Sequence, residues 1–149
     1  MRATRTWVVI ADGARARIAV NEGAGKGLRP ALRRDFAASR LPTSDLVSDR
    51  PGRYAGGGAV ASHGVEPQTD RHDHEKTQLV RDVAAAIERG ADRRAFDRLV
   101  LVAPPAILGK LRTALKARTR RLIAAEIGKD LTRLSLREMP QHLADAIAI

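Results

Sequence analysis

The chain has 149 residues, 44% of them hydrophobic, which is enough for one domain with a buried core. It contains no cysteine, so disulfides, thiol nucleophiles and zinc–thiolate sites are excluded, and aromatic residues make up only 3%. The formal net charge is +10 and arginine far outnumbers lysine, which favours an anionic partner.

The N-terminal segment predicts a β-hairpin. Residues 6–11 (TWVVIA) are apolar and mostly β-branched, and residues 14–20 (ARARIAV) place arginines on one strand face. Between them, Asp12-Gly13 is a strong signal for a two-residue hairpin turn. We therefore expect two antiparallel neighbours, with residues 6–11 at the centre of the sheet because both of their faces are apolar.

A long stretch without a core pattern follows a weaker third strand, which we expect over residues 31–39 at an edge of the sheet. Residues 42–72 carry prolines, many charges and the triplet Gly56-Gly57-Gly58, but almost no large apolar side chain. A segment of this composition buries too little apolar surface to order itself. The sequence therefore predicts a flexible loop over about 42–72, with no regular secondary structure.

Helices and strands alternate in the second half of the chain. Apolar residues at 79, 80, 83, 84 and 87 form one stripe of a helix. Asp73 suits its N-cap and Gly90 suits the position after its end. The remaining predicted elements are a strand over 97–105, a helix over 106–117, a strand over 120–127 and a last helix over 135–149. In this last helix Pro140 indicates either a kink or a start nearer residue 139.

This order of elements predicts a single α/β domain over residues 1–149, with three layers, α/β/α. Two strand–helix units require parallel strands with right-handed crossovers, and the hairpin requires one antiparallel pair. The expected mixed sheet has five strands in the order 3-2-1-4-5, numbered along the chain, with strand 2 antiparallel to the rest. No apolar run reaches the length of a signal-peptide core or a membrane helix, so we expect a soluble, cytoplasmic protein without membrane contact.

The basic residues are concentrated near the two ends of the chain. Residues 1–35 and residues 105–149 each have a net charge of +5, whereas residues 36–104 are neutral. This charge favours RNA as a partner, although it also suits a solubilising surface, and few aromatic side chains are present to stack on bases. The candidate phosphate-binding residues are Arg15, Arg17, Arg50, Arg53, Arg118, Arg120 and Arg121.

An alternative hypothesis is a metal-dependent nuclease or phosphohydrolase. Asp12 ends the central strand, at the edge where α/β sheets keep their sites, but two-metal chemistry needs several convergent carboxylates. His72, Asp73 and His74 are of metal-ligating types, but acidic residues are also favoured at the start of a helix. Since a turn aspartate and a helix entry explain both groups, we expect no enzyme activity, no bound metal and no cofactor.

Four segments together resemble the bacterial host attachment protein family. They are TWVVIADGARARIAV (6–20), SDLVSDRPGR (44–53), LVAPPAILGKLR (101–112) and EIGKDLTRLSLREMPQHL (126–143). That family is in turn similar to the central domain of archaeal and eukaryotic peptide-chain release factors and of Pelota-like factors. The resemblance implies a ribonuclease H-like fold and a role close to the ribosome.

The resemblance also bears on the glycine triplet. In release factors the loop at this position carries Gly-Gly-Gln, which enters the peptidyl transferase centre. Here no glutamine follows Gly58, and Gln68 lies ten residues further on. Pelota-like factors also lack the motif and still bind ribosomes, so the resemblance implies a binding module that does not hydrolyse peptidyl-tRNA.

Overall fold

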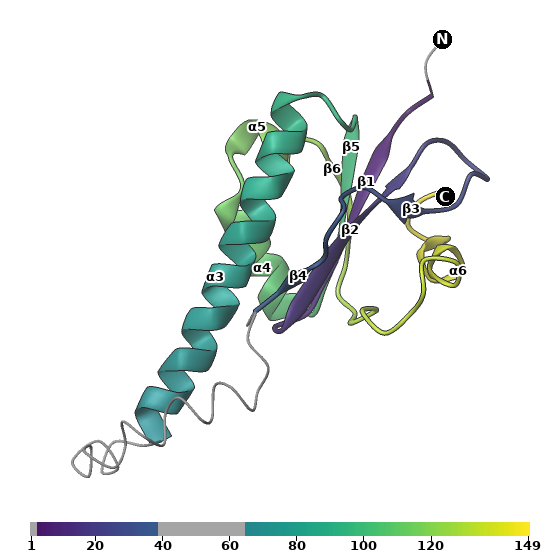
Figure 1. The fold of residues 1–149 in the computed structure, drawn as a ribbon. Helices are drawn as coiled ribbons and strands as arrows, with labels where there is room; N and C mark the ends of the chain where they lie inside the picture. The colour runs from purple at the N-terminus through teal and green to yellow at the C-terminus, as the bar shows by residue number, and fades with distance from the viewer. Residues whose placement is uncertain (1–2, 39–64) are drawn as a thin grey trace.

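A mixed β-sheet with helices against it forms the centre of the protein (Figure 1). The computed structural model describes residues 3–38 and 65–149, including the side chains of 3–38 and 71–149. The strands are β1 (Thr6–Ala11), β2 (Arg15–Asn21), β3 (Arg29–Pro30), β4 (Phe36–Ala37), β5 (Arg98–Val102) and β6 (Ile123–Ile127). The helices are α3 (Val65–Asp92), α4 (Pro105–Ala114), α5 (Ala117–Arg120) and α6 (Met139–Leu143).

The strand pairing confirms a mixed sheet of the α/β class. β1 is central, antiparallel to β2 and parallel to β5, and β5 is parallel to β6. All six residues of β1 are buried, as expected for a strand that is apolar on both faces. The predicted hairpin joins β1 to β2, with Ala11 opposite Ala16. Its turn lies one residue later than Asp12-Gly13, because the Asp12 N–H still bonds to the Arg15 carbonyl at 2.9 Å.

The edge of the sheet beyond β2 differs from the prediction. Residues 31–39 do not form one strand; instead β3 and β4, each of two residues, pair antiparallel with β2. The order is β3-β2-β1-β5-β6 with β4 also beside β2, so the sheet has six strands rather than five. Pro30 has no N–H for the ladder and Arg33, Arg34 and Asp35 are exposed, which explains why the pairing is interrupted between the two short strands.

The two faces of the sheet are covered differently. On one face, α3 and α4 pack against buried side chains of β1, β2 and β5. On the other face, Val8, Ile10, Val100 and Val102 pack against the C-terminal segment, which contributes Leu131, Met139, Leu143 and Ile147. In that segment the predicted helix over 135–149 is only the five-residue α6. The three-layer α/β/α arrangement is therefore not confirmed, because most of this covering chain is not helical.

A closed turn explains the late start of α6. Ser135 and Glu138 have the spacing of a capping box, and the Glu138 carboxylate accepts a hydrogen bond from the Ser135 hydroxyl at 2.9 Å. The Glu138 N–H returns a bond to that hydroxyl at 3.2 Å and also reaches the Ser135 carbonyl at 3.1 Å. Pro140 then occupies the start of α6, where its missing N–H costs no helical hydrogen bond.

Helix α3 begins at Val65 and not at Asp73. The prediction that residues 42–72 lack regular structure is therefore wrong for 65–72, and its remainder lies in residues 39–64, outside the described residues. Pro67 falls in the first turn of the helix, where proline is tolerated. None of the helices in the described part of the chain is long and apolar enough to cross a membrane.

The end of α3 also differs from the prediction, because Gly90 lies inside the helix. The helix ends two residues later with a Schellman-type pattern, in which Ala95 N–H reaches the Gly90 carbonyl at 2.8 Å and Arg94 N–H reaches the Ala91 carbonyl at 3.0 Å. Arg94 takes the left-handed position of this motif, with φ of 56°. An arginine therefore stands where glycine is usual.

Candidate functional site

Three segments that are separate in the sequence meet where the parallel strands β1, β5 and β6 begin. Glu88, near the end of α3, accepts hydrogen bonds from the Lys116 N–H at 2.8 Å and from the Thr119 hydroxyl at 2.7 Å. The Asp92 carboxylate pairs with the Arg118 guanidinium at 2.5 Å. Because Thr119 is buried, Glu88 satisfies a hydroxyl that water does not reach. These bonds fix α5 against the end of α3.

The start of β1 is attached to the same place. The Asp97 carboxylate accepts a bond from the Arg5 N–H at 2.7 Å, and the Arg5 guanidinium donates to the Arg94 carbonyl. On the neighbouring strand, Arg98 donates to the hydroxyl of Thr6 at 2.7 Å. The loop between α3 and β5 is therefore held against β1, which brings residues 88–98 beside residues 116–121 and Arg5.

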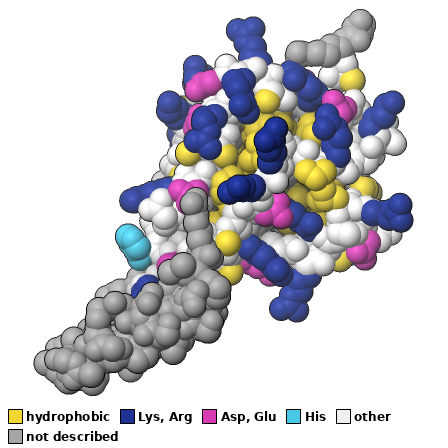
Figure 2. Space-filling model, in the orientation of Figure 1, with side chains coloured by type: hydrophobic (Ala, Val, Ile, Leu, Met, Phe, Trp, Pro, Cys, Tyr) yellow, Lys and Arg dark blue, Asp and Glu magenta, His cyan; other side chains and the backbone are white. Residues whose placement is uncertain are grey.

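These segments form a strongly basic surface, which we call the amino-edge arginine cluster. Its carboxylates are Glu88, Asp92 and Asp97. Its basic residues are Arg5, Arg89, Arg93, Arg94, Arg98, Lys116, Arg118, Arg120 and Arg121. Figure 2 shows many Lys and Arg side chains over the upper part of the molecule, where Figure 1 places α5 and the end of α3.

Several of these arginines are not used by the fold. Arg89, Arg93, Arg94 and Arg121 are exposed, and their side chains have no partner among the described residues. By contrast, Arg118 pairs with Asp92. The cluster therefore presents several guanidinium groups that remain available to an anion, and a guanidinium matches phosphate oxygens with two parallel hydrogen bonds.

The structure separates the arginines that the sequence grouped together. Arg118, Arg120 and Arg121 belong to the amino-edge arginine cluster, where Arg120 donates to the Leu115 carbonyl at 2.5 Å. Arg15 and Arg17 lie on β2, near the hairpin turn at the opposite end of β1. Arg15 and Arg17 thus do not share a surface with Arg118, Arg120 and Arg121. Arg50, Arg53 and the triplet Gly56, Gly57 and Gly58 lie outside the described residues.

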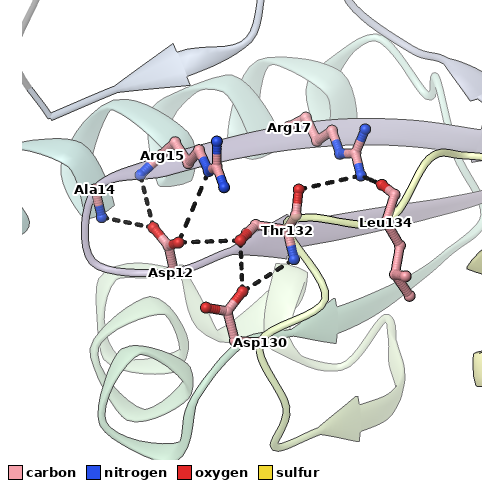
Figure 3. Close-up of polar contacts among 7 residues, drawn as sticks. All are labelled: Asp12, Ala14, Arg15, Arg17, Asp130, Thr132 and Leu134. Atoms are coloured by element: carbon pink, nitrogen blue, oxygen red, sulfur yellow. Dashed lines mark hydrogen bonds and ion pairs between the residues drawn. The ribbon is translucent and has the colours of Figure 1, made fainter.

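Arg17 has a structural role that the sequence did not reveal (Figure 3). Its guanidinium donates to the backbone carbonyls of Thr132, at 3.5 Å, and of Leu134. Both carbonyls belong to the C-terminal segment that covers the second face of the sheet. Arg15 is more exposed and lies 3.9 Å from the Asp12 carboxylate. Arg17 therefore anchors the C-terminal segment to the sheet, whereas Arg15 lies beside the hairpin turn.

Asp12 is held as a turn residue. One carboxylate oxygen accepts bonds from the backbone N–H groups of Ala14 at 2.7 Å and Arg15 at 2.9 Å, which is a typical turn arrangement. The other oxygen lies 3.0 Å from the Thr132 hydroxyl (Figure 3). That hydroxyl is also 2.5 Å from Asp130, and its hydrogen bond lowers the pKa of the Asp130 carboxyl, together with the bond from the Thr132 N–H.

A small pocket of about 480 Å³ lies at this carboxyl edge of the parallel strands. Asp12, Asp130, His72 and Glu75 line it, together with Lys76. Asp130 follows β6 and was missed by sequence reasoning, because a lone aspartate after Gly-Lys carries no motif. Asp12 and Asp130 nevertheless line the same pocket, although they follow different strands. The carboxyl ends of parallel strands are where α/β folds commonly have their binding sites.

The predicted cluster of His72, Asp73 and His74 does not converge on one point. The three residues are consecutive on α3, so their side chains leave the helix about 100° apart, and only His72 lines the pocket. Asp73 and His74 are exposed. Among residues 3–38 and 71–149, no group of three His, Asp or Glu side chains is arranged to hold a metal ion.

The comparison with family models agrees with the family resemblance. No curated protein matches the sequence. Among solved structures, an archaeal translation termination factor is similar, with a TM-score of 0.46 and 9% sequence identity over 95% of this chain. This chain spans only 38% of that factor's length. The family model described as "Protein required for attachment to host cells" matches residues 7–143, which is nearly the whole chain, and the protein therefore belongs to this family.

Proposed function

We propose that this member of the host attachment family is a non-catalytic, cytoplasmic binding module that contacts RNA, free or in the ribosome, through the amino-edge arginine cluster. The observation that carries the proposal is the imbalance of charge within three adjoining segments, where nine basic side chains face three carboxylates. A purely structural set of arginines would be paired. Here Arg89, Arg93, Arg94 and Arg121 have no side-chain partner in the described part of the chain.

The expected binding depends on phosphates rather than on bases. Base stacking needs exposed aromatic rings, and the aromatic side chains Trp7 and Phe96 near this edge are both buried. Affinity for RNA should therefore vary little with base sequence. It should fall steeply as the salt concentration rises, because the free energy gained by releasing counterions from the RNA then becomes smaller. Such a contact suits the phosphate backbone of a large folded RNA.

Charge reversal within the cluster should weaken RNA binding. We expect Arg93→Glu/Arg121→Glu to reduce affinity for a fluorescent single-stranded RNA at least about tenfold, because it removes two phosphate contacts and adds repulsion. The double variant Arg133→Glu/Arg137→Glu makes the same change in net charge on exposed residues of the C-terminal segment and serves as the control. Anisotropy titrations at about 50 mM and 200 mM salt measure both the affinity and its salt slope.

Two results would contradict the proposal: no RNA binding by the unaltered protein at low salt, or an equal loss of affinity in both double variants. Cosedimentation with ribosomes repeats the comparison on the larger target. The same assay with Arg50→Glu/Arg53→Glu tests the prediction that residues 42–72 take part, which the described residues leave untested.

Substitution of Arg94 should change both the stability of the protein and its affinity for RNA. An arginine at φ of 56° costs about 1–2 kcal/mol relative to a right-handed position, and glycine removes this cost. We expect Arg94→Gly to raise the free energy of unfolding by about 1 kcal/mol in urea titrations and also to weaken RNA binding. Arg137→Gly, at an exposed site outside the cluster, is the control for loss of charge. If Arg94→Gly kept full RNA affinity, Arg94 would not belong to the binding surface.

A second candidate function is hydrolysis at the carboxyl-edge pocket, which is favoured by the meeting of Asp12, Asp130, His72 and Glu75. We expect the protein to hydrolyse neither RNA nor peptidyl-tRNA, with or without added divalent ions. Asp12→Asn should act only on stability, since the carboxylate accepts two backbone hydrogen bonds in the turn. RNA cleavage that Asp12→Asn abolishes would make this candidate the function.

A further inference from the structure

Helices α3 and α4 lie side by side on one face of the sheet (Figure 1). A groove of about 530 Å³ lies between their side chains. A volume of this size is ample for several side chains of a partner. The groove is lined by Thr77, Val80 and Arg81 of α3 and by Ala106, Gly109, Lys110, Arg112, Thr113 and Ala114 of α4. It shares no residue with the amino-edge arginine cluster.

The sequence of α4 produces this groove. Ile107, Leu108 and Leu111 are buried and attach the helix to the core. The next face of the helix carries small residues at Ala106 and Gly109, spaced by three positions. Because neither side chain is long, the wall of α4 is low beside α3, and the largely buried side chain of Val80 contributes to the floor of the groove.

Gly109 has no visible role in the fold. A Cβ atom at this position would meet nothing within 4 Å. Glycine inside a helix costs about 0.5–1 kcal/mol relative to alanine, so the isolated chain is less stable for having it. Gly90 of α3 is different, because a Cβ there would collide with Trp7. The space beside Gly109 thus allows an atom of a binding partner to approach the helix backbone closely.

The rim of the groove is positively charged. Arg81 and Lys110 are exposed and have no side-chain partner among the described residues, whereas Arg112 pairs with Glu126 at 2.7 Å. Among the described residues, no carboxylate lines the groove. Its occupant must therefore tolerate an apolar floor at the centre and two unpaired cations at the edge.

We propose that the α3–α4 groove binds an acidic segment of a partner protein. A small or medium apolar side chain of that segment lies over Gly109 and Val80, and flanking carboxylates pair with Arg81 and Lys110. RNA fits this groove less well, since phosphates gain nothing from the apolar floor and no aromatic side chain lines it. The protein thus has a second interaction surface, of different chemistry from the arginine cluster.

A selection experiment tests this assignment. A phage-displayed library of random peptides is selected on the full chain, and the enriched peptides are synthesised with a fluorescent label for anisotropy titrations. We expect enriched peptides to combine Asp or Glu with Leu, Ile, Val or Met. Gly109→Leu should lower their affinity at least about tenfold by filling the groove, and Arg81→Glu/Lys110→Glu should lower it similarly by reversing the rim charge.

The controls separate loss of binding from loss of folding. Gly109→Leu should unfold in urea no earlier than the unaltered protein, because its side chain enters open space. Ala144→Leu, which adds one carbon fewer at an exposed position on the other side of the sheet, should leave peptide affinity unchanged. RNA affinity should be unchanged by Gly109→Leu.

The proposal fails if no peptide is enriched, if the enriched peptides are not acidic, or if they bind Gly109→Leu as well as the unaltered protein. It also fails if Gly109→Leu reduces RNA affinity, because the groove would then be part of the RNA surface.

Discussion

Gly90→Ala is expected to lower the free energy of unfolding by about 3 kcal/mol, although alanine normally stabilises a helix interior. A Cβ at residue 90 would lie 2.4 Å from the Trp7 ring. That ring cannot move aside easily, since it is buried and packs on Phe96 with ring centroids 4.8 Å apart. Urea titration measures the loss directly, and the thermal midpoint should fall by about 6–12 °C.

Gly109→Ala is the matched control, because it makes the same change within a helix where the new Cβ meets nothing. It should raise stability by about 0.5–1 kcal/mol. Combining Gly90→Ala with Trp7→Leu should cost less than the sum of the two single changes, since the smaller side chain removes the collision. Equal effects of Gly90→Ala and Gly109→Ala would show that the contact between α3 and Trp7 does not limit this helix.

Met139→Ala should also cost about 3 kcal/mol, within the range of about 2–5 kcal/mol for a buried methionine. Met139 is 0% exposed and packs with Val8, Ile10, Val100 and Val102 on the second face of the sheet. Within the described part of the chain, the only helix that covers this face is the short α6, so few other side chains are available to fill the space that the substitution leaves. The measurement is the unfolding free energy from urea titration.

Gln141→Ala, on the exposed side of the same short helix, should change stability by less than about 0.5 kcal/mol. Hydrogen exchange adds a second measurement, because loosening of the C-terminal segment should also speed exchange of its own amides. If Met139→Ala were neutral, the segment would contribute little to the stability of the sheet.

The hairpin shows which parts of the fold local chemistry specifies. Asp12-Gly13 encodes a tight turn, and the apolar run of residues 6–11 encodes a strand that is buried on both faces. Both features depend only on neighbouring residues, and the structure has the pair in the expected place. The parallel pairing of β6 with β5 follows from chain direction, because helices connect these two consecutive strands.

Where an element begins and ends depends on distant residues. Gly90 has the appearance of a helix stop, yet Trp7 requires a glycine there and the helix ends at Asp92 instead. The charged run before Asp73 has the appearance of a loop, yet α3 already includes it from Val65. Local composition cannot report the contact between Gly90 and Trp7.

The net charge of sequence segments did not reveal the amino-edge arginine cluster, for a related reason. Residues 36–104 are neutral as a whole, so the sequence did not single out Arg89, Arg93, Arg94 or Arg98. The fold places the basic end of this stretch beside Arg118, Arg120 and Arg121, while the acidic residues are spread along α3. A surface is formed by residues that are close in space, and an average along the chain conceals it.

The sequence by itself thus determined the α/β class, the hairpin, the strand segments near the sheet centre and the family, because each depends on local pattern or on order along the chain. Only the tertiary structure decided which arginines share a surface, that Arg17 anchors the C-terminal segment, and that Asp130 lies near Asp12. Each of these depends on contacts between residues far apart in the chain, which are set by how α3, α5 and the C-terminal segment pack on the sheet.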